Sequence, residues 1–392
     1  MIRGFMKTTS LTTLVAAAGI LMGNFAYAPA NAADLGGGCC ADLEERVAEL
    51  EATTARKGNR VVSLQIYGQV NKGLLIWDDG VESDAYVVDN DASGSRIGFK
   101  GEATLRPGWK AGYLIELNIQ DAATDVVSQN NDEGDSNDIS IRFSNWYIEN
   151  ERLGRLTVGQ ASRATDGINE IILAGSLRDS STQWGGAFVV RTVGGGSSSF
   201  TLDDFASDLD GGRDDVIRYD SPSLYGFIFS ASWGDDDIGD IALRYQNEWN
   251  SVRIAAGIGY QWVSNGSDYE VLSGSISVMH IPTGIYAAFS VGGRDWESST
   301  LPDDSYWYVQ AGVERKWLPY GSTTIYGDVG HYDDFLSSGS SEADRWGLGL
   351  VQRFDSAAME FYAQASFWDF DDSTATEYEG QSFVLIGSRI KF

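Results

Sequence analysis

The chain of 392 residues contains only two cysteines and two histidines. Cys39 and Cys40 are adjacent, so they cannot join distant parts of a fold; an intermolecular bridge, a strained vicinal pair and no role at all remain open. Neither His280 nor His331 clusters with acids at metal-ligand spacing. No phosphate-binding loop and no nucleophile–base motif is present. The sequence therefore predicts no enzymatic activity, no metal site and no cofactor.

Basic residues are scarce as well. The chain has 28 Lys and Arg against 56 Asp and Glu, a net charge of −28, which becomes −30 once the bases Arg3 and Lys7 are removed with a signal peptide. Nucleic-acid binding requires a basic face, so we expect no nucleic-acid partner. Acidic runs such as 214–215 and 235–237 fall between strand patterns. We expect acidic loops, which keep exposed segments soluble or attract cations to an opening.

Beyond residue 32 the sequence lacks any run of 18 apolar residues, so it predicts no transmembrane helix. The first residues are typical of a secretory signal. Arg3 and Lys7 precede an apolar core over 11–22, and small residues at 30–32 form a cleavage site. We expect residues 1–32 to be a signal peptide, cleaved before Ala33.

A short helix is predicted between the signal and the first strand. Leu43, Val47 and Leu50 follow the spacing of a coiled-coil seam. A helix of about 15 residues is marginal alone in water, so burial against copies of itself would stabilise it. We interpret 33–60 as a periplasmic linker with an oligomerisation helix; a helix that lies on a barrel rim or plugs it is the alternative.

Alternation of apolar with small or polar residues dominates 61–392. In strand 251–264 one face holds Val252, Ile254, Ala256, Ile258, Tyr260 and Trp262, and the other holds Arg253, Ala255, Gly257, Gly259 and Gln261. A soluble sandwich would bury the first face. A closed barrel in lipid would turn it outward. Glycine is abundant and aromatic residues reach 12%, which suits tight turns, small interior positions and interfacial belts.

The pattern predicts sixteen strands, near 61–77, 94–105, 109–121, 139–151, 154–161, 216–221, 224–235, 238–249, 251–264, 269–281, 284–297, 304–318, 322–334, 343–355, 357–371 and 379–392. Short turns alternate with longer acidic loops such as 78–93, 122–138 and 296–304. This alternation favours an all-β, 16-stranded antiparallel transmembrane barrel over a Greek-key sandwich. The longest connection, 162–215, contains a helix-like patch at 168–173. We expect it to fold into the lumen and narrow it.

Several segments carry a family resemblance: 67–71 (YGQVN), 95–102 (SRIGFKGE), 156–160 (LTVGQ), 218–222 (RYDSP) and the terminal Phe392. In this order, 61–392 resembles the trimeric general-diffusion porins of Gram-negative outer membranes, particularly alphaproteobacterial ones. The resemblance implies a multi-pass barrel in the outer membrane, bounded by lipid and lipopolysaccharide, that passes ions and small hydrophilic solutes. It also implies a homotrimer and a signal for the barrel-assembly machinery at Phe392 with Ile390.

The resemblance further implies a constriction in which loop acids face wall bases. Side-chain parity places Arg96, Lys100, Glu116 and Arg142 on the lumen side, with Ser144 inward and Phe143 and Tyr147 outward. On the long loop Asp179 matches the family pattern. Gln183 stands where the family has a second acid, and Asp166 and Glu170 are the acids that could compensate. Lys72 and Arg218 fall near wall positions, but the side that each faces stays open.

Two other functions remain open at this stage. A channel selective for sugars or organic acids would need an aromatic track in the lumen, and parity turns Trp146 and Trp368 inward. A surface adhesin or a secreted β-sandwich lectin is the alternative from another class. For a channel, the acidic loops favour a mild cation preference, although the inward arginines oppose it locally.

Overall fold

The computed structural model describes residues 62–134, 139–177, 184–235, 237–264, 266, 268–298, 301–337 and 339–392. The predicted signal peptide, the cysteine pair and the coiled-coil residues Leu43, Val47 and Leu50 lie outside the described residues. The same is true of the constriction candidates Asp179 and Gln183. The predicted boundaries at residues 32 and 60 stay predictions.

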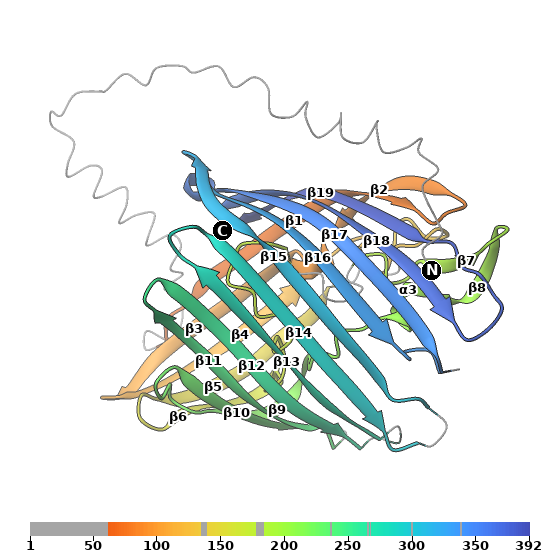
Figure 1. Ribbon diagram of the computed structural model, residues 1–392. Coiled ribbons are helices and arrows are strands. Elements are labelled where there is room, and N and C mark those ends of the chain that lie inside the picture. Colours follow the sequence, from red (N-terminus) through yellow and green to blue (C-terminus); the bar gives the residue numbers. More distant parts are fainter. Residues whose placement is uncertain are drawn as a thin grey trace, which may run out of the picture. The chain divides into compact units, whose positions relative to one another are not determined.

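Within the described residues, sixteen strands form a closed antiparallel barrel (Figure 1). They are β1 (Gln65–Asp78), β3 (Arg96–Arg106), β4 (Trp109–Asn118), β5 (Ser140–Asn150), β6 (Gly154–Ser162), β9 (Arg213–Asp220), β10 (Phe227–Gly234), β11 (Gly239–Trp249), β12 (Val252–Val263), β13 (Tyr269–His280), β14 (Ile285–Trp296), β15 (Asp304–Leu318), β16 (Gly321–Asp333), β17 (Ser341–Phe354), β18 (Met359–Asp372) and β19 (Gln381–Lys391). Pairing of β1 with β19 closes the wall. This pairing joins the first and last strands of the wall and removes the two open edges that they would otherwise present to hydrocarbon. The predicted fold class is confirmed.

In the described part of the chain, three further strands and three short helical turns accompany the barrel: β2 (Ser83–Asp89), β7 (Val189–Thr192), β8 (Gly196–Thr201), α3 (Leu202–Phe205), η1 (Asp91–Ser93) and η2 (Asp355–Ala357). The predicted long loop 78–93 is wrong, because β2 returns along β1 after a tight turn. Asp79 builds that turn by accepting hydrogen bonds from the backbone N–H groups of Val81 and Glu82. Such local side-chain caps favour turns over longer loops.

The wall is apolar outside and polar inside. On β13, Leu272 is 57% exposed and Ile276 is 42% exposed, whereas the alternating Ser275 and Ser277 are buried. On β12, Trp262 is exposed on the outer face and Gln261 is buried. A soluble protein would show the reverse, so the predicted assignment of the two faces is confirmed. Among the described residues, no helix is long and apolar enough to cross a bilayer.

The third loop, L3 (residues 163–212), folds inside the barrel. Its first half contains no helix at 168–173, contrary to the sequence prediction, and runs along the inner wall. Hydroxyls on β13 replace the missing helical hydrogen bonds: the N–H groups of Ile171 and Leu173 donate to Ser275 Oγ and Ser277 Oγ, at 3.2 and 3.1 Å. An irregular backbone at membrane depth is tolerated where the protein satisfies it in this way.

The stem of L3 is fixed by buried charges. Asp240 on β11 accepts hydrogen bonds from the backbone N–H and the hydroxyl of Thr165, at 2.7 and 2.6 Å. Arg244 donates to the carbonyls of Ala164 and Asp166, at 2.7 and 2.8 Å. Arg218 lies inward and donates to the carbonyls of Ser162 and Arg163. Charge-assisted bonds of this kind are stronger than neutral ones, so they hold the loop against the wall.

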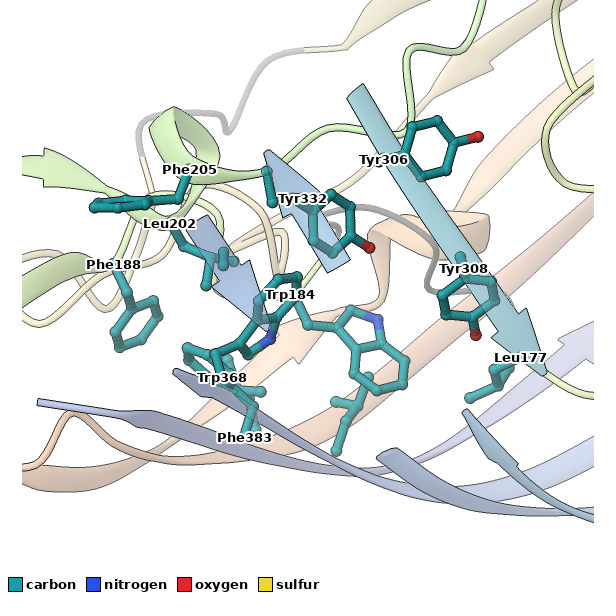
Figure 2. Packing of buried hydrophobic residues seen from close by; sticks show 14 of the residues in the cluster. Leu177, Trp184, Phe188, Leu202, Phe205, Tyr306, Tyr308, Tyr332, Trp368 and Phe383 are labelled. Atoms are coloured by element: carbon teal, nitrogen blue, oxygen red, sulfur yellow. The ribbon is translucent and has the colours of Figure 1, made fainter. Parts of the chain in front are cut away.

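The second half of L3 forms the hydrophobic core, which lies inside the barrel. Figure 2 shows Trp184, Phe188 and Phe205 from the loop packed with wall residues such as Trp368 and Phe383. The ring centroids of Phe188 and Phe383 are 5.1 Å apart with edge-to-face geometry. The hairpin of β7 and β8 extends this half to one end of the barrel, where Val193 N donates to the carbonyl of Glu377 (Figure 1). One side of the lumen is thereby filled.

The carboxyl terminus completes the barrel. Phe392 exchanges two backbone hydrogen bonds with Gly68, at 3.0 and 3.1 Å. A Cβ at position 68 would lie 2.5 Å from the Phe392 ring, so this approach requires glycine. Phe392 and Ile390 are 64% and 43% exposed, on the outer face.

Candidate functional site

A charged cluster on the inner wall has Glu116 at its centre. Its carboxylate lies 3.0 Å from Arg142 Nε and 3.5 Å from Arg96 Nη1. The Tyr67 hydroxyl donates to it at 2.6 Å. Three predicted wall residues are thus brought together from β3, β4 and β5. Two guanidinium groups share one carboxylate, so the cluster has a net positive charge.

Arg142 reaches this cluster through a β-bulge. Phe143 is opposite Glu116 and Ile141 is opposite Leu117, so Arg142 is the extra residue in β5. A bulge shifts the alternation of the strand that contains it. The predicted parity of β5 is therefore wrong beyond this point: Phe143 and Tyr147 face inward opposite Glu116 and Gly112, while Ser144 and Trp146 face outward.

Further bases extend the inner wall on both sides of the cluster. Lys100 is exposed, 5.1 Å above the Tyr67 ring. Arg389 pairs with Glu360 at 2.5 Å, and Arg353 lies 3.8 Å from Glu314. The sequence analysis missed Arg353 and Arg389. Alternation with outward apolar residues on β17 and β19 could have placed both arginines inward. Lys72, in contrast, alternates in step with the exposed outward residues Val70 and Leu74 and pairs with Asp89 at 3.4 Å, so it does not belong to these inward bases.

Three described acids of L3, Asp166, Glu170 and Asp210, form a second cluster. Asp210 accepts hydrogen bonds from the Gly167 N–H with both carboxylate oxygens, at 3.0 and 2.9 Å. Burial, and then the charges of Glu170 and Asp166, raise the pKa of Asp210 to about 7. Asp166 in turn acts electrostatically on Arg142 of the wall. The predicted Asp166 and Glu170 are brought together, and Asp210 is an acid that the sequence analysis missed.

A cavity of about 230 Å³ separates L3 from the opposite wall. Its lining includes Ile172, Ala174 and Ser176 of L3, and Arg353, Glu360 and Arg389 of the wall. Two guanidinium groups and a carboxylate therefore face the loop across this cavity, which has room for several water molecules. This arrangement can pass or transiently hold small polar solutes, with charge on one side.

The two tryptophans that were predicted to form an aromatic track, both among the described residues, do not line an open lumen. Trp368 faces inward as predicted, but it is 2% exposed and packs 5.5 Å from Tyr332 in the core under L3. Trp146 is 47% exposed on the outer face, so its predicted inward orientation is wrong. The cavity described above is instead lined by polar and charged groups of the wall.

The sequence profile described as Gram-negative porin matches residues 12–373. The chain belongs to the Gram-negative porin family. This porin is therefore a multi-pass β-barrel of the outer membrane that forms a channel for passive diffusion. No curated protein sequence is significantly similar to it.

Solved structures share the fold of this porin. The anion-selective porin from Comamonas acidovorans matches with a TM-score of 0.60 and 16% identity, over 84% of this chain and 100% of that chain. OmpF of Salmonella typhi in complex with daunomycin matches with a TM-score of 0.57 and 13% identity, over 86% of this chain and 99% of that chain. The trimer form of OmpT of Vibrio cholerae has the same TM-score of 0.57 and 13% identity, over 85% of this chain and 100% of that chain. At these identities the likeness extends to the fold alone.

The pKa of Asp210 predicts a pH-dependent ion preference. Because the group ionises around pH 7, a rise from pH 6 to pH 8 adds negative charge to the loop acids. Cation preference should therefore increase over this interval. The raised pKa also stabilises the folded loop below about pH 4, and this contribution is lost as the pH passes through about 7. Asp210→Asn should weaken the pH dependence of the ion preference, which reversal potentials in a salt gradient would measure. The same pH dependence in Asp210→Asn as in the wild type would contradict the role of Asp210.

Proposed function

We propose that the channel of this porin passes ions and small hydrophilic solutes through a constriction where L3 acids face wall bases. The wall side consists of Arg96, Lys100 and Arg142 with Glu116, and the loop side of Asp166 and Glu170. Asp179 and Gln183 would complete the loop side. The observation that carries this proposal is the Glu116 cluster, which holds two arginines at the lumen surface, one of them within electrostatic reach of Asp166.

The selectivity that we propose is weak and favours cations above pH 7. Each wall arginine is partly compensated by a nearby carboxylate, whereas Asp166, Glu170 and Asp210 add charge to the loop once Asp210 is ionised. The net charge of −28 adds a longer-range attraction for cations, which salt screens within about 8–10 Å. The preference should thus depend mainly on the constriction.

Conductance of the purified protein in a planar bilayer tests the proposal. We expect discrete steps with an ohmic current and a reversal potential displaced modestly towards that of the cation. Absence of steps from correctly folded, heat-modifiable protein would refute the channel. A strong anion preference would leave the channel intact and refute the proposed selectivity.

The alternative of a sugar- or acid-selective channel has less support. An open aromatic track would favour it, but Trp368 is buried beneath L3 and Trp146 faces outward. Concentration-dependent block of single-channel current by a sugar or an organic acid in the micromolar range would revive it. We also propose that the protein has no enzymatic activity, since the family consists of channels; among the described residues, no group of three or more potential metal ligands occurs.

We further propose a homotrimer in contact with outer-membrane lipid and lipopolysaccharide. The trimer form of OmpT has the same fold and supports this oligomeric state. The exposed apolar residues on the outer face of the wall support the lipid contact. Cross-linking of the protein in detergent would test it: a ladder ending at three copies is expected, and a stable monomer would oppose it.

An assembly signal at the carboxyl terminus is part of the same proposal. Phe392 and Ile390 present exposed side chains beside the barrel seam, where the assembly machinery could bind them. Deletion of Phe392 should greatly reduce the amount of heat-modifiable barrel in the outer membrane in cells. Refolding of the same variant in detergent serves as the control, because a purely structural role would impair both equally.

A further inference from the structure

The strand that follows β1 is interrupted in the wall. β2 and β3 run in the same direction, and both pair with β1. On β1, Gln69 pairs with Arg96 and Lys72 pairs with Asp89, so only Val70 and Asn71 lie between the two paired regions. On the other strand, six residues, 90–95, lie between them. Six residues cannot pair with two in the plane of the wall, so part of segment 90–95 must leave that plane.

The excess residues fold into the lumen. Gln69 and Asn71 are buried inward side chains of β1, whereas Val70 between them is exposed outward. Gln69 Nε2 donates to the Ser93 carbonyl at 2.6 Å, and Asn71 Nδ2 donates to the same oxygen at 3.0 Å. A segment bound by inward side chains must lie on the inner side of the strand that bears them.

This infolded turn, η1, is held rigidly. Asn90 Oδ1 accepts hydrogen bonds from Ala92 N and, at 3.1 Å, from Trp184 Nε1 of the L3 core. The N–H of Asp91 donates to the Thr124 hydroxyl at 3.0 Å. These partners are buried or part-buried. The turn therefore cannot move back towards the wall easily when a larger side chain is placed on it.

We propose that η1 forms the second side of the constriction, opposite L3, and that Ala92 sets the bore and the size limit for solutes. Ala92 and Ser93 line the cavity of about 230 Å³ together with Ile172 and Ala174 of L3. Arg96 connects the turn to the wall bases, because its Nη2 donates to Ser93 Oγ at 2.7 Å. The inference rests on the proposed channel function and adds a wall element that narrows the pore from the side that L3 does not occupy.

Ala92→Trp tests the inference. Pore diameter controls flux, so an indole in this cavity should lower single-channel conductance roughly twofold or more. In liposome swelling, entry of larger sugars should fall more than entry of the smallest. Ala85→Trp is the matched control, since Ala85 is exposed on the outer face of β2, in the same interrupted strand. A conductance for Ala92→Trp equal to that of Ala85→Trp would overturn the inference.

Thiol labelling provides a second test with less bulk. In a Cys39→Ser/Cys40→Ser background, Ala92→Cys should react with a charged, water-soluble methanethiosulfonate added to an open channel, and each reaction should reduce the current in one step. Ala85→Cys should give no current change. Failure of Ala92→Cys to respond would overturn the inference even if Ala92→Trp did not fold. If the background protein itself formed no channel, the proposed function would fail instead.

Discussion

Replacing Arg96 and Arg142 together with alanine should increase the cation-to-anion permeability ratio strongly. Both guanidinium groups lie within 3.5 Å of Glu116 at the lumen surface, and the charge of the loop acid Asp166 acts on Arg142. One unit charge about 4 Å from a passing ion contributes about 1 kcal/mol in a water-like medium, which is roughly fivefold in relative permeability for each arginine. Reversal potentials at about 0.1 M salt would measure the effect, because 1 M salt screens beyond about 3 Å.

The control removes the same charge elsewhere. Arg106 and Arg152 are exposed residues beside short turns, so Arg106→Ala/Arg152→Ala changes the net charge equally without altering the cluster. A shift no larger than that of this control would refute the role of the cluster. Adding Glu116→Gln to the double arginine variant should reverse part of the increase in cation preference, because it removes a negative charge. It also removes a buried carboxylate that would have lost both arginine partners and kept the Tyr67 hydroxyl.

Local alternation was sufficient to predict the barrel and two members of the charged cluster, because apolar neighbours of Arg96 and Glu116 marked the outer face. Arg142 was also placed inward, but from an alternation with Phe143 that the bulge breaks, since Phe143 itself lies opposite the inward Glu116. This inference holds only while the period of two is unbroken. The bulge at Arg142 adds one residue to β5, and every later side chain of that strand then changes face, as Trp146 shows. One extra residue in a strand does not change its composition, so the bulge could not be predicted from the sequence.

The parts that the sequence analysis missed depend on contacts between distant segments. Asp240 and Arg244 looked like ordinary strand residues, yet they hold the stem of L3. The break at 90–95 was interpreted as the end of a loop, because a polar turn inside the lumen and a polar loop outside have similar composition. Ala92 has no chemical signature at all. Its importance follows only from the position of L3 across the cavity.

Trp184→Ala should open and destabilise the filled side of the lumen while the barrel persists. Trp184 is 1% exposed, packs in the core that L3 forms with the wall, and donates its Nε1 hydrogen bond to Asn90. Truncation of a buried tryptophan costs about 3–5 kcal/mol. The wall has its own continuous backbone pairing, so this loss should fall on the docking of residues 184–209 rather than on the strands. We expect larger and noisier conductance steps, with heat-modifiable migration retained.

Trp146→Ala is the matched control, because it removes the same side chain from the outer face, where it is 47% exposed. It should leave step size and current noise unchanged. Trp184→Phe keeps most of the packing and loses the hydrogen bond to Asn90, about 1 kcal/mol, so it should give an intermediate phenotype. Quiet, wild-type steps from Trp184→Ala would mean that the aromatic core does not hold L3 in place. The constriction would then depend on Asp240, Arg244 and the serine hydroxyls of β13 alone, and Asp240→Ala would have to produce the open, noisy channel instead.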